Sequence, residues 1–209
     1  MIIRGILPIL DVGPLVSQDR APDVAKALLA GGARAFQLRA KSITDRELLE
    51  LARALAAIAR DGNADFYLND RPDIALLAGA NGVHLGQDDL PAREARAWLP
   101  PKMAIGVSCH SVQDVDRALR EGVASYLGFG PVFATATKAN PEPVVGLDGL
   151  RAVVEKHPGV CFVAIGGITV ERLPEVRAAG APAAAMISGI LSAPDVAARM
   201  REASAAFAA

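Results

Sequence analysis

The chain has little of what marks several protein classes. Its two cysteines, Cys109 and Cys161, have no metal-type spacing and form no disulfide framework, which favours buried thiols in a reducing compartment. Aromatic residues make up only 4% of the 209 residues and the net charge is −1, so the footprint of a nucleic-acid-binding protein is missing. The opening apolar run, MIIRGILPILDVGP, is interrupted and too short to span a bilayer. We therefore expect a cytoplasmic protein that binds neither nucleic acid nor membrane.

Short apolar runs alternate with amphipathic segments along the whole chain. The runs predict strands at residues 6–10, 35–38, 66–68, 83–85, 104–107, 126–129, 160–165 and 184–187. The amphipathic segments predict helices at residues 22–32, 44–62, 72–78, 91–99, 111–122, 147–155, 170–179 and 194–206. No linker or low-complexity stretch divides them, so residues 1–209 are expected to form one domain.

This alternation is typical of the α/β class with a parallel sheet. Eight strand–helix units in about 200 residues favour a closed single-domain TIM (β/α)₈ barrel, and a doubly wound open sheet is the alternative. In such a barrel, polar residues at the end of a strand point to the active-site face.

The segment after the second predicted strand reads QLRAKS, with Gln37, Arg39 and Lys41 at alternate positions. Because side chains of an extended chain alternate between faces, all three are expected on one face. A guanidinium and an ammonium group so placed can bind an anion such as phosphate. The alternative is an exposed row of charges.

Acidic and amide side chains follow the third and fourth strands, in LNDRPD and HLGQDD. Asn69, Asp70, Asp88 and Asp89 are therefore expected to converge from adjacent strands. Carboxylates of this kind, together with substrate phosphate, suit Mg²⁺. The alternative makes Asp70 and Asp88 helix caps.

Ser108 follows the fifth strand, where its hydroxyl can contact a phosphate or a ring nitrogen. The neighbouring His110 is interpreted as a cap or packing residue, and His157 as a helix-end residue. His84 can point into the barrel or outward. None of the three histidines has a catalytic-triad partner at a recognisable spacing.

Glycines and small polar residues follow the last two strands, in AIGGIT and MISGI. Gly166 and Gly167 let the backbone approach an oxyanion, and the helix that follows offers N–H groups. Together with Ile187 and Ser188 they indicate the phosphate site that barrels of this kind use.

The sixth strand ends in Thr135, Thr137 and Lys138. These residues stand between the cationic and acidic groups on one side and the glycine loops on the other. The hydroxyls can hold one substrate while the ammonium group neutralises a diphosphate, so we expect two anionic groups in one pocket.

Seven motifs occur in order from Gln37 to Ser188: QLRAK, LNDRPDIA, GANGVHLGQDDLP, GVSCHS, YLGFGPVFATATK, AIGGIT and MIS. In this series the chain resembles the thiamine phosphate synthase family. The resemblance implies a TIM barrel that joins 4-amino-2-methyl-5-hydroxymethylpyrimidine diphosphate to 4-methyl-5-(2-hydroxyethyl)thiazole phosphate. It also implies an ionising route, in which the bond to diphosphate breaks before the thiazole nitrogen attacks.

The resemblance assigns roles by position. Pyrimidine diphosphate would be bound by Gln37, Arg39, Lys41, Asn69, Ser108 and Lys138, of which Arg39, Lys41, Ser108 and Lys138 would be catalytic. Thiazole phosphate would be bound by Thr135, Ala136, Thr137, Gly167, Ile187 and Ser188, and Mg²⁺ by Asp70 and Asp89. Two features depart from the family: Ala134 replaces a usual Pro, and ILPILDVGP replaces an aromatic-rich start ending in Thr-Asp. No residue before Pro22 is therefore assigned a role.

Two other functions stay open. A thiazole tautomerase of the same superfamily would carry a catalytic His near the end of the sixth strand, where this chain has Pro131. A non-catalytic barrel that binds thiamine phosphates would need no leaving-group chemistry. The expected partners are small-molecule substrates, and a homo-oligomer is left open.

Overall fold

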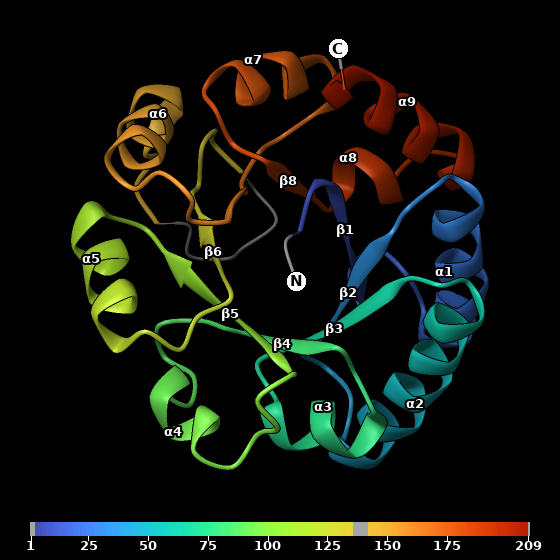
Figure 1. Ribbon diagram of the computed structural model, residues 1–209. Helices are drawn as coiled ribbons and strands as arrows, with labels where there is room; N and C mark the ends of the chain where they lie inside the picture. Colours follow the sequence, from blue (N-terminus) through green and yellow to red (C-terminus); the bar gives the residue numbers. More distant parts are fainter. Residues whose placement is uncertain (1–2, 136–141, 209) are drawn as a thin grey trace.

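The computed structural model describes residues 3–135 and 142–208, in which parallel strands form a closed barrel (Figure 1). The strands are β1 (Gly5–Val12), β2 (Ala35–Ala40), β3 (Asp65–Asn69), β4 (Gly82–Leu85), β5 (Ala104–Cys109), β6 (Tyr126–Phe129), β7 (Phe162–Ala164) and β8 (Ala183–Met186). Each pairs with its sequence neighbour, and β1 also pairs with β8, from Gly5 opposite Ala183 to Pro8 opposite Met186. This last pairing closes the sheet, so the predicted TIM barrel is confirmed and the open sheet is wrong.

Helices surround the barrel (Figure 1). They are η1 (Gln18–Arg20), α1 (Ala21–Ala30), α2 (Asp45–Asp61), α3 (Pro72–Ala78), α4 (Ala92–Arg96), α5 (Val112–Glu121), α6 (Gly146–Lys156), η2 (Val170–Arg172), α7 (Leu173–Ala178), α8 (Ser188–Leu191) and α9 (Val196–Ala208). Every predicted helical region contains a helix, and neither η1 nor α8 was predicted. None of the helices in the described part of the chain has the length and apolar character needed to cross a membrane.

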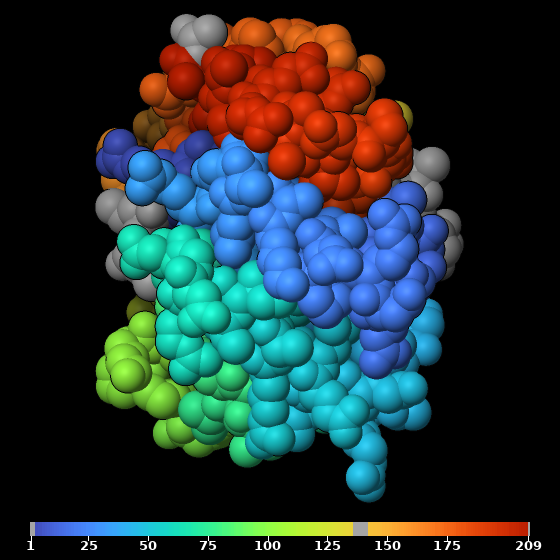
Figure 2. Space-filling view, turned by 90° about the vertical axis from the view of Figure 1, so that its right-hand side faces the viewer, coloured from blue at the N-terminus to red at the C-terminus, as the bar shows by residue number. Residues whose placement is uncertain are grey.

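The first and last helices reinforce the closure of the barrel. Figure 2 shows α1 in blue directly against α9 in red. At their contact, a Cβ added to Gly31 would lie 2.6 Å from Cβ of the buried Met200. The absence of a side chain at this position therefore lets the two helices approach closely.

Apolar residues pack on both faces of the strands. In β1, for example, Leu7 and Ile9 belong to the cluster inside the barrel, whereas Ile6 and Leu10 pack against the surrounding helices. Because a parallel sheet is buried on both faces, its strands are nearly continuous apolar runs. Polar side chains such as Asp11, Arg39, Asn69 and Ser108 lie towards the carboxyl ends of their strands, which is where a site can form.

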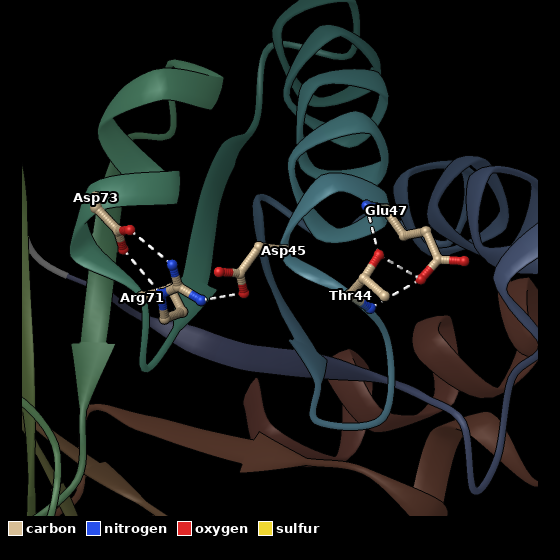
Figure 3. A network of polar contacts seen from close by, with 5 residues as sticks. All are labelled: Thr44, Asp45, Glu47, Arg71 and Asp73. Carbon is tan, nitrogen blue, oxygen red and sulfur yellow. Dashed lines mark hydrogen bonds and ion pairs between the residues drawn. The ribbon is translucent and has the colours of Figure 1, made fainter.

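The loops after β2 and β3 are joined by a polar network (Figure 3). Thr44 caps α2 by accepting a hydrogen bond from the Glu47 N–H, and the Glu47 carboxylate accepts one from the Thr44 N–H at 2.8 Å. The Arg71 guanidinium lies between Asp45, with which it forms an ion pair, and Asp73, at 2.7 Å. This network fixes the loop that contains Asp70.

Candidate active site

Two adjoining cavities open at the carboxyl ends of the strands. The first has a volume of about 350 Å³ and is lined mainly by polar side chains from the ends of β2 to β5. The second has a volume of about 80 Å³ and is lined by the loops that follow β6, β7 and β8. His110, Ile165 and Ile187 line both cavities, so the two share a wall.

The described residues that the sequence predicted for the site fall into these two cavities. The first cavity is lined by Gln37, Arg39, Lys41, Asn69, Asp70, Asp89 and Ser108, and the second by Thr135, Gly167, Ile187 and Ser188. The predicted Ala136, Thr137 and Lys138 lie outside the described residues. The described members of the two predicted groups line different cavities, except Ile187, which lines both, and the role of each residue stays a prediction.

Arg39 is held by a carboxylate that sequence reasoning missed. Asp11 lies opposite Arg39 in the β1–β2 register, and its Oδ1 is 2.6 Å from the guanidinium. The Asp11 side chain is fully buried, whereas that of Arg39 is 17% exposed. Among the described residues, the second oxygen of Asp11, Oδ2, has no hydrogen-bond partner. One feature of the sequence could have identified Asp11: it is a charged residue at the end of an apolar strand. It was missed because no role was assigned to that segment.

Asp70 and Asp89 meet where the loops after β3 and β4 adjoin. Asp70 has a left-handed backbone with φ of 66°, and its N–H donates to the His84 carbonyl at 2.8 Å. Its carboxylate is 3.1 Å from the Lys41 ammonium. Asp89 accepts a hydrogen bond from the Gly86 N–H at 2.6 Å. Burial and a hydrogen bond with the Asp70 side chain raise the pKa of Asp89 to about 6.

The alternative in which Asp70 and Asp88 are helix caps is wrong. The N-cap of α3 is Arg71 and that of α4 is Pro91, and neither helix has a side-chain cap. Asp70 instead faces the first cavity together with Asp88. Its left-handed backbone is the physical reason, because an N-cap residue is normally extended.

Two histidines belong to the site. His84 points into the barrel, with Nε2 2.9 Å from Ser108 Oγ and Nδ1 3.1 Å from the Tyr126 hydroxyl. His110 Nδ1 is 2.6 Å from the Gly130 carbonyl, and its ring lines both cavities. The N-cap of α5 is Ser111, so the interpretation of His110 as a cap is wrong.

His157 lies at the end of α6, as predicted. Its Nε2 is 3.2 Å from Asp116. It lines neither of the two cavities.

The wall of the second cavity requires glycine at two adjacent positions. Gly166 and Gly167 both have positive φ, of 99° and 62°. A Cβ at Gly166 would also lie 2.5 Å from Cα of Pro131. Arg172 donates to the Gly167 carbonyl at 2.8 Å, with its guanidinium 4.4 Å from the centre of the Phe133 ring. The loop after β7 is therefore packed closely against the segment that follows β6.

Comparisons with known proteins agree with this architecture. The family model described as thiamine monophosphate synthase matches residues 7–190. The chain is 44% identical over 179 residues to the thiamine-phosphate synthase of Moorella thermoacetica, which covers 86% of this chain and 84% of that protein. Identity to the thiamine-phosphate synthase of Chloroflexus aurantiacus is 41% over 179 residues, covering 86% and 82%.

A comparison with a solved structure agrees with these sequence matches. Thiamine phosphate pyrophosphorylase from Pyrococcus furiosus has a TM-score of 0.87 and 34% identity to this chain, and the match covers 98% of this chain and 95% of that one. A 3-hexulose-6-phosphate synthase, at 20% identity and a TM-score of 0.70, shares the fold alone. Since the family model spans most of the chain and the relatives match over most of their own length, this enzyme belongs to the thiamine monophosphate synthase family.

Proposed function

We propose that the protein joins 4-amino-2-methyl-5-hydroxymethylpyrimidine diphosphate to 4-methyl-5-(2-hydroxyethyl)thiazole phosphate and releases thiamine phosphate and diphosphate. The observation that carries the proposal is the pair of cavities with a shared wall. The larger cavity has cationic and acidic side chains suited to a diphosphate, and the smaller one has the glycine loop suited to a single phosphate. Ligands bound in the two cavities would lie next to each other at the residues that line both, such as His110, Ile165 and Ile187.

The pyrimidine diphosphate is assigned to the larger cavity. Arg39 and Lys41 would bind the diphosphate, since they bring positive charge to the same cavity from the end of β2 and the residue that follows it. Gln37, Asn69 and Ser108 supply neutral hydrogen-bonding groups for the ring. The assignment of Lys138 to the diphosphate rests on its position in the sequence and on the family resemblance, since it lies outside the described residues.

Asp70 and Asp89 fit a magnesium ion. They are two carboxylates in contact, with Lys41 beside them, and Mg²⁺ is usually held by one or two carboxylates, waters and substrate phosphates. Within the described residues, no group of three or more His, Cys, Asp or Glu side chains could hold a metal, so water and diphosphate oxygens would complete the coordination. When bound, Mg²⁺ would neutralise negative charge on the diphosphate.

The thiazole phosphate is assigned to the smaller cavity. Gly166 and Gly167 turn the backbone so that it can approach the phosphate closely, and Ser188 begins α8 in the same wall. Thr135 and Ile187 line the space beside them. Ala136 and Thr137 are added to this set by the family resemblance.

The residues suit a dissociative substitution. The C–O bond breaks and the diphosphate leaves with the electron pair, while the pyrimidine stabilises the resulting carbocation. The thiazole nitrogen then forms the new C–N bond, and no general base is needed because this nitrogen carries no proton. Arg39 and Lys41 would stabilise the charge that grows on the diphosphate. Holding both substrates together can lower the barrier by about 7 kcal/mol.

The proposed partners are therefore the two small-molecule substrates. A cytoplasmic location is proposed as well, and the free thiols of Cys109 and Cys161 support it. Whether the chain forms a homo-oligomer would be measured by light scattering.

The direct test is diphosphate release by the purified protein with both substrates and Mg²⁺, with each component omitted in turn. Release that needs all three, with an equal amount of thiamine phosphate, supports the proposal. Isomerisation of the thiazole phosphate without metal would instead indicate a tautomerase. Binding of both substrates without turnover would indicate a non-catalytic barrel. The Lys138→Ala variant should keep the fold and lose most of kcat/KM.

A further inference from the structure

A polar side chain with no role so far lies where the two cavities adjoin. Among the described residues, those that line both cavities are His110, Glu142, Ile165, Ala185 and Ile187. Of these, His110 and Glu142 carry polar side-chain groups, and His110 is half-buried whereas Glu142 is exposed. His110 is therefore the better-enclosed polar group at the place where two ligands would lie next to each other.

The chemistry of its partner fixes which ring nitrogen of His110 carries a proton. Nδ1 lies 2.6 Å from the Gly130 carbonyl oxygen. A carbonyl oxygen can only accept a hydrogen bond, so Nδ1 must be protonated and donate to it. In a neutral imidazole the other nitrogen, Nε2, is then unprotonated and can only accept.

Both ends of this hydrogen bond are held in place. The main-chain N–H of His110 donates to Asp114 Oδ2 at 3.0 Å, and the same oxygen accepts from Ser111 Oγ at 2.9 Å. Gly130 is packed so closely that a Cβ on it would lie 2.0 Å from the Ile165 carbonyl oxygen. The imidazole ring is therefore oriented before any ligand binds.

Nε2 of His110 is left available to a ligand. It makes no hydrogen bond to any described residue. It is also not enclosed by protein, because the buried side-chain atoms without a partner in the described part of the chain are Asp11 Oδ2 and His157 Nε2. His110 thus offers an accessible acceptor where its side chain lines the two cavities.

We propose that Nε2 of His110 accepts a hydrogen bond from the exocyclic amine of the pyrimidine, which makes His110 a further catalytic residue. This inference rests on the proposed function. Of the two substrates, only pyrimidine diphosphate carries an N–H donor, and that donor is the exocyclic amine. The thiazole ring has no N–H, so an unprotonated nitrogen at this position distinguishes the two rings.

The hydrogen bond becomes stronger as the reaction proceeds. When the C–O bond breaks, the electron pair leaves with the diphosphate, and the amine nitrogen shares the positive charge that remains on the pyrimidine. Its N–H is then a stronger donor to the neutral imidazole. No proton is transferred, and the charge passes to the thiazole nitrogen when the C–N bond forms. Because the contact is stronger in the transition state than in the bound substrate, it increases kcat.

The first experiment measures the protonation of His110 without any ligand. Two-bond ¹⁵N–¹H correlation spectra of ¹⁵N-histidine-labelled protein at pH 8 distinguish protonated from unprotonated ring nitrogens. The signals that are missing from a His110→Asn variant identify His110 among the three histidines of the chain. We expect a protonated Nδ1 and an unprotonated Nε2. A protonated Nε2, alone or together with a protonated Nδ1, would overturn the inference.

The second experiment measures recognition of the amine by titration calorimetry with Mg²⁺ present. The probes are pyrimidine diphosphate and the analogue in which a methyl group replaces the exocyclic amine. Wild-type protein should bind the analogue about tenfold more weakly than the parent. His110→Asn keeps a donor near the position of Nδ1 but has no acceptor at that of Nε2, so it should lose most of this difference. Equal discrimination by wild type and His110→Asn would overturn the inference.

Two further variants separate this contact from a structural role. His110→Gln can place its amide oxygen near the position of Nε2, so it should retain part of the discrimination that His110→Asn loses. Glu142→Gln is the matched control at the same junction and should discriminate as wild type does. Loss of discrimination in Glu142→Gln but not in His110→Asn would assign the amine to Glu142 and overturn the inference.

The kinetic effect should fall on kcat. For His110→Asn we expect kcat to decrease between about tenfold and a hundredfold, with a smaller change in KM, and an unchanged kcat would overturn the catalytic role. Near-ultraviolet circular dichroism checks that the variant is folded. If wild-type protein does not bind the parent pyrimidine diphosphate, the proposed function fails, whereas the ligand-free spectra test the state of His110 separately.

Discussion

The carboxylate of Asp11 faces the guanidinium of Arg39 across the β1–β2 pair, at 2.6 Å and with the carboxylate fully buried. A buried charge of this kind is tolerated only when it is paired. The barrel thereby holds a cation at the wall of its larger cavity before any ligand arrives. The cation that we propose for the diphosphate is thus oriented by the first strand.

Replacing Asp11 with Asn should destabilise the protein. The substitution keeps the size of the side chain but leaves the guanidinium without its counter-charge, so we expect a loss of about 2–4 kcal/mol in the free energy of unfolding. Urea denaturation measures this change in the free energy of unfolding. The control is the double variant Asp11→Leu with Arg39→Met, which removes both charges and should recover stability without recovering kcat/KM. Unchanged stability of Asp11→Asn would contradict the proposed importance of the pair.

Removing either proposed metal-binding carboxylate should change the response to Mg²⁺. For Asp70→Asn and Asp89→Asn, we expect the Mg²⁺ concentration at half-maximal activity to rise at least about tenfold, because each variant removes one charged ligand. Asp88→Asn is the matched control, since Asp88 lines the same cavity but is not assigned to the metal. Isothermal titration calorimetry with Mg²⁺ alone measures the affinity for the metal without any turnover. Equal effects of all three variants would contradict the assignment.

Substitution by alanine should have opposite effects on the stability of the protein at two glycine positions. Gly149 lies within α6, where a Cβ would meet only the Val145 Cβ at 3.4 Å, so Gly149→Ala should stabilise the protein by about 0.5–1 kcal/mol. Gly166 has a φ of 99° and a Cβ there would collide with Pro131, so Gly166→Ala should destabilise it by about 2 kcal/mol or more. Thermal unfolding of both variants measures the contrast. A stabilised Gly166→Ala would show that the loop can rearrange.

Neither thiol should react in the folded protein. Burial raises the pKa of Cys109 to about 12 and also raises that of Cys161. At pH 8 we expect negligible reaction with Ellman's reagent in the native state and two equivalents in denaturant, consistent with the two cysteines of the chain. Because the folded-state pKa of Cys109 exceeds its ordinary value of 9.0, the associated stabilisation is complete below pH 9 and is lost as the pH rises towards 12. Rapid reaction of one native thiol would contradict its burial.

Much of the fold could be predicted because the physics of a parallel barrel is simple. Strands buried on both faces, such as FYL and AIGV, are apolar runs, and alternation with helices leaves few topologies. The convergence of Gln37, Arg39 and Lys41 followed from period two alone. The helix α8 was missed because its four residues, Ser188–Leu191, barely complete one helical turn.

The polar contacts between strands could not be predicted in the same way. The alternation in GVHL places His84 on the face opposite to Val83, but both faces of the strand are buried, so the pattern does not say which face is inside. Asp11 and Tyr126 look like parts of ordinary apolar strands until the register places them beside Arg39 and His84. Such partners depend on which strands are adjacent, which only the closed sheet defines.

The shared wall of the two cavities has a thermodynamic consequence. A ligand that moves His110, Ile165 or Ile187 in one cavity changes the surface that the other cavity offers. The two occupancies are then linked by a coupling free energy, and linkage is reciprocal. Whatever factor the first ligand applies to the affinity for the second, the second applies to the first, so the order of addition determines the path to the ternary complex and leaves its stability unchanged.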